Sequence, residues 1–572
     1  MTAAAAPADA LDARNDLRRA LELHTAGWVG QAEALYRRSL ALDPGDPDTL
    51  HMAGVLATQM GDPAGGIRLV RRSLAVRDEG QARYNLAVAL KQAGRFDEAL
   101  DETKAAVRLA PGFPQAHYNL GIALAERRQW REAADAYRAA IRLNPGYAAA
   151  YINIGNVLVD LWEPERAVAA YRNAIALDPT YPRVYSNMGN ALREYDRFAE
   201  GFVAVNRALT LDPALAPARH NLGNAYLEQG RHADAATSYR AAIALTPDHA
   251  AAHLGLSLTM LHGGDFARGW ATYEWRWKTG DAFLPPGPVW RGEEVAGKTV
   301  LLHAEQGFGD TLHFVRYAPM VAARGARVVL EVPGPLRRLL DRTPGVERVI
   351  TQGEPRPEYD AHCPLLSLPL AFGTRLETIP ADMPYLHADP AAVERWRAKL
   401  EGAGLEGGGA LRVGLVWAGN PRRNAINAHA IDRRRSMRLA QFAPLAGVPG
   451  VRFYSLQKGE ETAPQAKAPP AGMDLVDLMD EVGDFDDTAA LIANLDLVIG
   501  VDTSVIHLAG GLGKPVWMLS RYDACWRWLA EREDSPWYPT MRIFRQPQPG
   551  AWAPVVERLA DELRAWAGGK VR

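Results

Sequence analysis

The sequence predicts an α-solenoid of helical repeats over residues 11–280, followed by two α/β domains over residues 281–392 and 393–572. Small residues and prolines recur every 34 residues through the first half, which indicates a repeat array. This recurrence stops at a stretch rich in proline and glycine, as expected at a domain boundary. Apolar runs of strand type then alternate with helical patterns, which favours parallel sheets covered by helices.

The composition is that of ordinary globular domains: 48% of the 572 residues are hydrophobic and 23% are charged. Lys+Arg total 65 against Asp+Glu 67, so no global basic field is available and we expect no nucleic-acid partner. The two cysteines, Cys363 and Cys525, fit neither a disulfide framework nor a metal site. Residues 1–10 lack a secretory pattern, and no apolar run is long enough to span a bilayer, so we expect a cytoplasmic protein.

Two registers of the repeat define its helices. Prolines recur at the repeat spacing: Pro111, Pro145, Pro179, Pro213 and Pro247. Small residues recur where two helices are expected to cross closely: Ala99, Ala133, Ala167, Gly201, Ala235 and Gly269. Because proline disfavours helix in the residue before it, each one ends a unit of two helices, and about eight units fit between residues 11 and 280. The set resembles the tetratricopeptide repeat, which implies a binding surface without chemistry of its own.

Asparagines recur at the same spacing on the first helix of each unit: Asn85, Asn119, Asn153, Asn187 and Asn221. An Asn side chain offers a donor and an acceptor, so a ladder of amides can grip the backbone of an extended peptide. The arrangement resembles the O-linked N-acetylglucosamine transferases, whose repeats hold acceptor polypeptide on such a ladder. That resemblance implies acceptor binding by these five residues. The alternative is that Asn occupies this repeat position for structural reasons.

The boundary stretch is Phe283–Trp290, and the aromatic residues just before it are expected to pack the solenoid end onto the next domain. In the first α/β domain the expected strands are Thr299–His303, Ala326–Glu331 and Val346–Ile350. In the second they are Leu411–Trp417, Val451–Leu456, Leu495–Gly500 and Pro515–Leu519. Residues Asp389–Gly409 are expected to be helical and then glycine-rich, and the last helix to run from Trp552 to Trp566.

The first chemical motif, with Gly307, Gly309 and Asp310, lies at a strand-to-helix turn. Glycines there let backbone N–H groups approach a ligand, and a helix N-terminus favours negative charge. A dinucleotide fingerprint would require a third glycine where the chain has Leu312, so a dehydrogenase is disfavoured.

Further motifs are suited to phosphate. Asp502, Thr503, Ser504 and His507 follow a predicted strand at the start of a helix, where side-chain oxygens cap the helix or meet phosphate oxygens. An arginine cluster after another strand would neutralise a diphosphate through charge-assisted bonds: Arg433, Arg434 and Arg435, with Ser436 beside them. Lys458, at a strand end, is either a phosphate or base contact or a solvated lysine.

Residues 296–565 resemble the heptosyltransferase-type glycosyltransferases that are fused to tetratricopeptide repeats in bacteria. The resemblance rests on the Gly-Asp turn, on the Asp-Thr-Ser…His-Leu-Ala-Gly turn and on the stretch 532–539. It implies a GT-B fold of two Rossmann-like domains that binds a nucleotide sugar as substrate and needs no metal or other cofactor. Fusions of this layout include flagellin glycosyltransferases, whose repeats dock flagellin.

The resemblance assigns catalysis to Asp310, as the general base that deprotonates the acceptor hydroxyl. It assigns donor binding to Asp502, Thr503, Ser504 and His507. The other predicted donor-binding residues are argued from their chemistry: Gly307, Gly309, Arg433, Arg434, Arg435, Ser436 and Lys458. A plain N-cap is the alternative for Asp310, and His303 and His313 are alternative bases. The stretch Arg422–Ile431 is longer than the family pattern, which argues against transferring the family's phosphate role directly to Arg433–Arg435.

Together these features predict an enzyme that moves a sugar from a nucleotide-sugar donor to a protein held by the repeats, with Ser or Thr of flagellin as one candidate acceptor. A non-catalytic interaction scaffold is the first alternative, and the presence of Asp310 and of the complete 502–511 turn argues against it. An envelope heptosyltransferase acting on a lipid-linked saccharide is the second. It leaves the solenoid idle, and the chain has no strong basic or amphipathic membrane-facing element.

Overall fold

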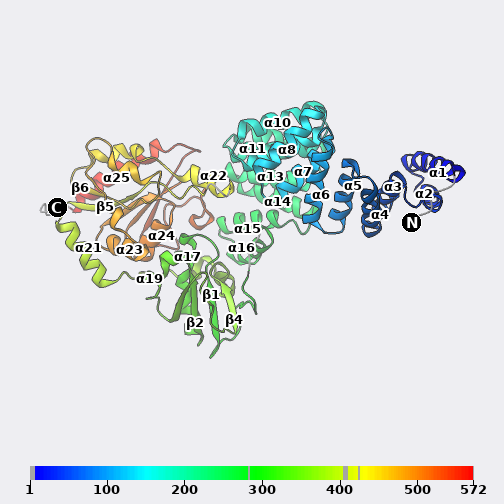
Figure 1. The fold of residues 1–572 in the computed structure, drawn as a ribbon. Coiled ribbons are helices and arrows are strands. Elements are labelled where there is room, and N and C mark those ends of the chain that lie inside the picture. Colours follow the sequence, from blue (N-terminus) through cyan, green and yellow to red (C-terminus); the bar gives the residue numbers. More distant parts are fainter. Residues whose placement is uncertain (1–6, 281–283, 403–409, 423–425, 571–572) are drawn as a thin grey trace. The chain divides into compact units, whose positions relative to one another are not determined.

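The computed structural model describes residues 7–280, 284–402, 410–422 and 426–570 (Figure 1). Within these residues, sixteen α-helices precede the first strand. From α3 to α15, helices of 13 and 14 residues alternate, which is the two-helix unit that the spacing of 34 predicts. The contacts divide the chain into two compact units, Met1–Leu192 and Arg193–Arg572. None of the described helices is long and apolar enough to cross a membrane.

The first unit consists of repeat helices. They are α1 (Pro7–Thr25), α2 (Val29–Leu42), α3 (Pro47–Gln59), α4 (Pro63–Val76), α5 (Gly80–Gln92), α6 (Phe96–Leu109), α7 (Pro114–Glu126), α8 (Trp130–Leu143), α9 (Ala148–Asp160), α10 (Pro164–Leu177) and most of α11 (Pro182–Glu194). A Cβ on Gly121 would lie 2.5 Å from the ring of Tyr137, and one on Gly155 would lie 2.6 Å from Tyr171. Both tyrosines are buried. The small residues are therefore required because a tyrosine of the next helix occupies the space beside them.

The second unit begins with the remaining repeat helices. They are α12 (Phe198–Leu211), α13 (Ala216–Glu228), α14 (His232–Leu245), α15 (Ala250–His262) and α16 (Phe266–Tyr273), which continues into the 3₁₀ turn η1 (Glu274–Lys278). Trp270 is buried and donates from its indole to the carbonyl of Thr374, 3.1 Å away, in the first α/β domain. One hydrophobic core joins Trp270 to Leu302 and Ile506. The prediction that aromatic residues pack the solenoid end onto the next domain is confirmed.

A four-stranded parallel sheet follows, in the order β3-β2-β1-β4. Its strands are β1 (Thr299–His303), β2 (Arg327–Val332), β3 (Val346–Thr351) and β4 (Ala361–Pro364). The sequence did not predict β4, because its Ala-His-Cys-Pro segment has no β-branched residue, yet all four residues are buried beside β1. Of the boundary stretch, Phe283 lies outside the described residues, while Val289 forms a bridge with His362 of β4.

The second sheet has six parallel strands in the order β10-β9-β8-β5-β6-β7. They are β5 (Leu411–Val416), β6 (Val451–Ser455), β7 (Leu475–Val476), β8 (Leu497–Val501), β9 (Val516–Ser520) and β10 (Met541–Arg545). The last helix, α25 (Ala553–Lys570), contains the predicted one, and the glycine-rich segment 403–409 lies outside the described residues. Parallel sheets and helices bear out the α/β prediction, whereas β7 and β10 were not predicted.

The strand order of each sheet reverses at one position. In the first sheet the reversal lies between β1 and β4, and in the second between β5 and β8. In open parallel sheets, ligands bind beyond the carboxyl ends of the strands at such a reversal. Two predicted motifs follow these strands: the turn at Gly307 comes after β1, and the turn at Asp502 comes after β8.

Candidate functional site

Helix α17 (Phe308–Phe314) of the first α/β domain packs against helix α24 (Ser504–Gly511) of the second. The contact depends on Gly309, because a Cβ there would lie 2.9 Å from the His507 ring and 3.5 Å from the Cα of Ser504. Gly309 was predicted to leave space for a ligand, but the space beside it is occupied by α24. The two motifs, almost two hundred residues apart in the sequence, meet at this junction.

Asp310 has two partners at the junction. Its Oδ2 accepts from the backbone N–H of Gly307, the N-cap residue of α17, at 3.0 Å, which satisfies one of the unpaired amides at that helix end. Its Oδ1 accepts from Nη2 of Arg527 at 2.5 Å. The guanidinium of Arg527 is buried, and Asp310 is its carboxylate partner. Asp310 is therefore the third residue of α17 and does not occupy its N-cap, which is Gly307, although its carboxylate does satisfy a backbone N–H at that helix end. It also forms an ion pair between the two α/β domains, and its role as a base stays a prediction.

A buried tyrosine links two histidines of the junction. The hydroxyl of Tyr538 lies 2.9 Å from Nδ1 of His313 and 2.9 Å from Nδ1 of His507. Burial lowers the pKa of His507 to about 4, although the nearby Asp502 acts in the opposite direction. Burial also lowers the pKa of His313 well below its usual value. Both imidazoles are therefore neutral at pH 7, and His313 forms part of the packed core between the domains.

The N-terminus of α24 carries an unpaired hydroxyl. Thr503 occupies the N-cap position, but its side chain makes no capping hydrogen bond. Its Oγ1 is buried and has no partner among the described residues. The neighbouring Asp502 is fixed by the indole N–H of Trp528, which donates to its Oδ2 at 2.9 Å. The turn thus presents a helix N-terminus and an orphan donor, both of which suit an anion.

Arg435 and Ser436 lie beside the same turn. Nη1 of Arg435 donates to the backbone carbonyl of Asp502 at 2.8 Å, and its Nη2 pairs with Asp432 at 2.9 Å. The hydroxyl of Ser436 bonds to Asp432 and accepts from the N–H of Gly419 at 2.9 Å. Of the predicted donor-binding residues, Arg435, Ser436 and the 502–507 turn therefore gather at the N-terminal end of α24.

Arg433 and Arg434 point elsewhere. Both are bound to Asp196, which follows helix α11, at 2.7 Å. Arg434 also pairs with Glu228 of α13 at 3.1 Å and with Asp523 at 3.3 Å. These guanidiniums hold α22 (Ile426–Arg435) against the repeats, so the structure gives them carboxylate partners in place of the predicted diphosphate.

The remaining predicted donor residues are spread out. Lys458 donates to the backbone carbonyl of Val482. A Cβ on Gly307 would lie 2.7 Å from Nη2 of Arg422, so this exposed guanidinium lies next to the turn that carries Asp310. The longer stretch Arg422–Ile431 is only partly described, since residues 423–425 lie outside the described residues.

The asparagine ladder makes contacts between repeats. Nδ2 of Asn85 lies 2.7 Å from Nε2 of His51, and Nδ2 of Asn153 donates to the hydroxyl of Tyr118 at 3.0 Å. Asn119 is hydrogen-bonded to Tyr84, and Nδ2 of Asn187 donates to the side chain of Asn156 at 3.0 Å. Each of these four amides reaches back to the preceding repeat, while Asn221 belongs to the other unit. The structural interpretation of the ladder therefore has direct support, and peptide binding is untested.

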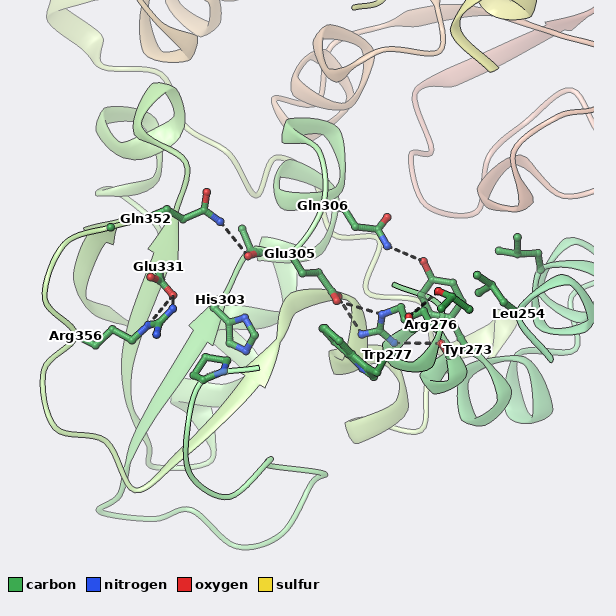
Figure 2. A pocket seen from close by; sticks show the side chains of 15 residues that line it. Leu254, Tyr273, Arg276, Trp277, His303, Glu305, Gln306, Glu331, Gln352 and Arg356 are labelled. Carbon is green, nitrogen blue, oxygen red and sulfur yellow. Dashed lines mark hydrogen bonds and ion pairs between the residues drawn. The ribbon is translucent and has the colours of Figure 1, made fainter. Parts of the chain in front are cut away.

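A pocket of about 520 Å³ lies at the carboxyl ends of the first sheet (Figure 2). His303, Glu305 and Gln306 reach it from the end of β1, Glu331 from β2 and Gln352 from just after β3. The end of the solenoid lines the other side, with Tyr273, Arg276 and Trp277 among its contributions. Sequence reasoning missed this pocket, although polar residues at three successive strand ends were a signal for it.

Comparisons with known proteins identify the class of the first half. Models described as tetratricopeptide repeat match residues 51–114, 114–147 and 220–281, and a TPR repeat model matches residues 163–194. The chain therefore contains tetratricopeptide repeats, as predicted, which supports a role in protein interaction.

The chain is also similar to Protein FlbA of Caulobacter vibrioides, with 32% identity over 335 residues. The match covers 53% of this chain and 53% of FlbA, so the chain spans about half the length of that relative. Among solved structures, YrrB, a TPR protein with an unusual peptide-binding site, has 22% identity over 32% of this chain and 95% of its own, at a TM-score of 0.28. PilF of Pseudomonas aeruginosa has 17% identity over 37% and 97%, at a TM-score of 0.34. TM-scores this low say nothing about function.

Proposed function

We propose that this chain is a glycosyltransferase of the GT-B type, in which the second sheet binds a nucleotide sugar and the repeats bind the acceptor protein. The observation that carries the proposal is an unpartnered hydroxyl at the N-terminal end of α24. There the buried hydroxyl of Thr503 has no partner among the described residues, at a helix N-terminus next to a reversal of strand order. A buried donor without an acceptor costs about 1–3 kcal/mol, and a phosphate oxygen would satisfy it.

The acceptor side of the proposal rests on the repeats, which support protein binding, and on the resemblance to repeat-fused flagellin glycosyltransferases. Flagellin is accordingly the first acceptor to test. Asp310 is the proposed base, because its carboxylate lies at the junction of the two α/β domains. It follows closely after β1, the strand at which the strand order of the first sheet reverses. The scaffold alternative is favoured by one observation, the ion pair with Arg527, since that pair occupies a carboxylate oxygen that a general base would have to present to the acceptor hydroxyl.

The decisive experiment measures nucleotide binding by calorimetry on the full chain and on Thr503→Val. The orphan hydroxyl contributes no internal hydrogen bond, so the variant should melt at the same temperature or higher. If the hydroxyl donates to a phosphate, nucleotide affinity should fall by about tenfold or more, because hydrogen bonds to charged groups contribute about 1.5–3 kcal/mol.

Thr540→Val is the matched control, because that hydroxyl already donates to the carbonyl of Lys514 at 2.7 Å. It should leave nucleotide affinity unchanged. Incubation of the wild type with nucleotide sugars and purified flagellin, followed by intact mass measurement, tests transfer itself. If the chain binds no nucleotide and no acceptor gains mass, the non-catalytic scaffold is the function that remains.

A further inference from the structure

The proposed function places the nucleotide at the second sheet, so the pocket at the carboxyl ends of the first sheet is left without a ligand. Its lining combines charged, amide and aromatic side chains. Four charged side chains line it, two arginines and two glutamates: Arg276, Arg356, Glu305 and Glu331. Arg276 holds Glu305 through two bonds, of 3.0 and 3.2 Å. Arg356 holds Glu331 at 3.0 Å. Figure 2 shows both pairs at the pocket wall, drawn with dashed lines.

The pocket has no net charge. His303 also lines it, and burial together with the neighbouring His362 and the two arginines lowers the pKa of His303 to about 3, so this ring is neutral at pH 7. The two cations and two carboxylates cancel. An anion such as a nucleotide, a phosphate or a carboxylate is favoured by unpaired cations, and both arginines of this lining are already paired with carboxylates. A neutral ligand fits it better than an ion of either sign.

The wall is rigid and rich in both donors and acceptors. The side chains of Arg276, Glu305 and Glu331 are 6%, 8% and 5% exposed, so their hydrogen-bonding atoms are fixed by packing. Gln306 donates to the hydroxyl of Tyr273 at 3.3 Å, and Gln352 to the carbonyl of Ala304 at 3.1 Å. These amides are held in place and bring further polar atoms to the lining.

One wall is aromatic. Trp277 lines the pocket and remains partly exposed, with the guanidinium of Arg276 4.4 Å from its ring centroid. Tyr273 and Leu258 lie on the same side. A ligand with hydroxyl groups around its edge and apolar C–H faces matches a lining that alternates fixed polar pairs with an aromatic surface. The volume of about 520 Å³ is in the range of small-molecule sites and exceeds what one hydroxylated side chain of a peptide would fill.

We propose that this pocket, between the end of the solenoid and the carboxyl ends of β1–β3, binds a neutral sugar ring that is separate from any nucleotide-linked sugar. Its position next to the Gly307–Asp310 turn, through Gln306, puts such a sugar beside the junction of the two α/β domains. The proposal concerns binding alone and stands whether or not the chain transfers a sugar.

The test is saturation-transfer NMR on the full chain without nucleotide, with methyl glycosides of glucose, mannose, galactose and N-acetylglucosamine as probes. Ring protons of at least one glycoside should receive saturation. Trp277→Ala should weaken that binding about tenfold, the loss typical of a central aromatic contact. Trp275→Ala is the matched control, because Trp275 stacks on His253 at 3.8 Å and does not line the pocket.

Glu305→Gln keeps the size of the side chain and leaves Arg276 its second carboxylate, Glu274, at 2.6 Å. It should also weaken glycoside binding, and it decides the matter if Trp277→Ala does not fold. The proposal is overturned if no glycoside is saturated, if the signal is equal in the pocket variants, or if added UDP removes it. A threonine peptide amide that binds in a Trp277-dependent way while no glycoside binds would also overturn it. Lack of nucleotide binding would refute the proposed function and leave this result standing.

Discussion

At the scale of single residues, the most informative pair is Asp310 and Arg527, which are 217 positions apart in the chain. One carboxylate caps a helix through one oxygen and neutralises a buried guanidinium through the other. Asp310 therefore contributes to stability as well as to the proposed chemistry, and a substitution that abolishes activity could do so for either reason. A useful experiment has to separate these two effects.

Asp310→Asn should abolish transfer, with a loss of about 10²–10⁴ in rate, because an amide caps the helix but cannot accept the proton. The same change leaves Arg527 buried without a carboxylate, which costs about 3–5 kcal/mol. We therefore expect a lower melting temperature as well as lost turnover, with nucleotide affinity retained within a few-fold where the protein is folded. Turnover, melting and nucleotide titration are measured on the same sample.

The double variant Asp310→Asn/Arg527→Gln removes both charges and should recover much of the lost stability. If Asp310 is the base, the double variant stays inactive although it is folded. Recovered turnover would mean that Asp310 acts only through the ion pair and the cap, and His303 would then be the next candidate.

At the scale of elements, α22 is the helix whose role the structure changes most. Its end was expected to carry a diphosphate site, and two of its three arginines instead bind carboxylates of the repeat region. Arg434 is 11% exposed and Glu228 is 7% exposed, so this pairing is largely shielded from water. The third arginine, Arg435, remains beside the N-terminus of α24.

Arg434→Met should lower the free energy of unfolding by about 1.5–3 kcal/mol, because it removes charged hydrogen bonds to Glu228 and Asp196 while Arg193 still compensates buried Glu228. It should leave nucleotide affinity unchanged, since its contacts are with carboxylates. Thermal melting and nucleotide titration check the two statements. Arg452→Met, which removes a pair with exposed Asp474, is the control and should cost no more than about 1 kcal/mol. A large fall in nucleotide affinity for Arg434→Met alone would restore the phosphate role.

At the scale of the whole molecule, the chain combines an interaction module with two parallel sheets, and the proposed function needs both. The repeats would select the acceptor, and the sheets would supply the reaction. Four asparagines that were expected to face a peptide already bond to neighbouring repeats. Acceptor binding and repeat stability are therefore coupled in this module, and a substitution there must be compared with one that affects stability alone.

Replacing Asn119, Asn153 and Asn187 together by Ala should lower acceptor affinity by at least about tenfold if the amides hold peptide, because each lost bond contributes about 0.5–1.5 kcal/mol. The same variant should melt at a lower temperature, since at least Asn153 and Asn187 brace adjacent repeats. Acceptor affinity by calorimetry and a melting curve are the two measurements.

Tyr118→Phe and Asn156→Ala provide the comparison, because they remove the bracing partners of Asn153 and Asn187 and keep both ladder amides. They should reduce stability to a similar degree and leave acceptor affinity intact. If acceptor affinity falls equally in both sets, the ladder acts only by bracing the repeats.

The sequence by itself determined the solenoid. Each unit packs mainly on its neighbours, so the small residues and tyrosines that fit together, such as Gly121 and Tyr137, lie within one 34-residue unit and their pairing recurs with a fixed period. Strands such as β1 and β8 were also evident, because a buried parallel strand is a continuous apolar run. By contrast β4, which has no such run, is held in place by its register with β1.

The tertiary structure alone decided which charges meet. An arginine at a strand end looks the same in sequence whether it binds a phosphate or a carboxylate, and only the fold brought Arg434 to Glu228 and Arg527 to Asp310. The neutral pocket at the ends of β1–β3 likewise depends on residues from the solenoid and the sheet. The physical reason is that hydrogen-bonding partners distant in the chain leave no periodic trace in it, whereas packing between sequence neighbours does.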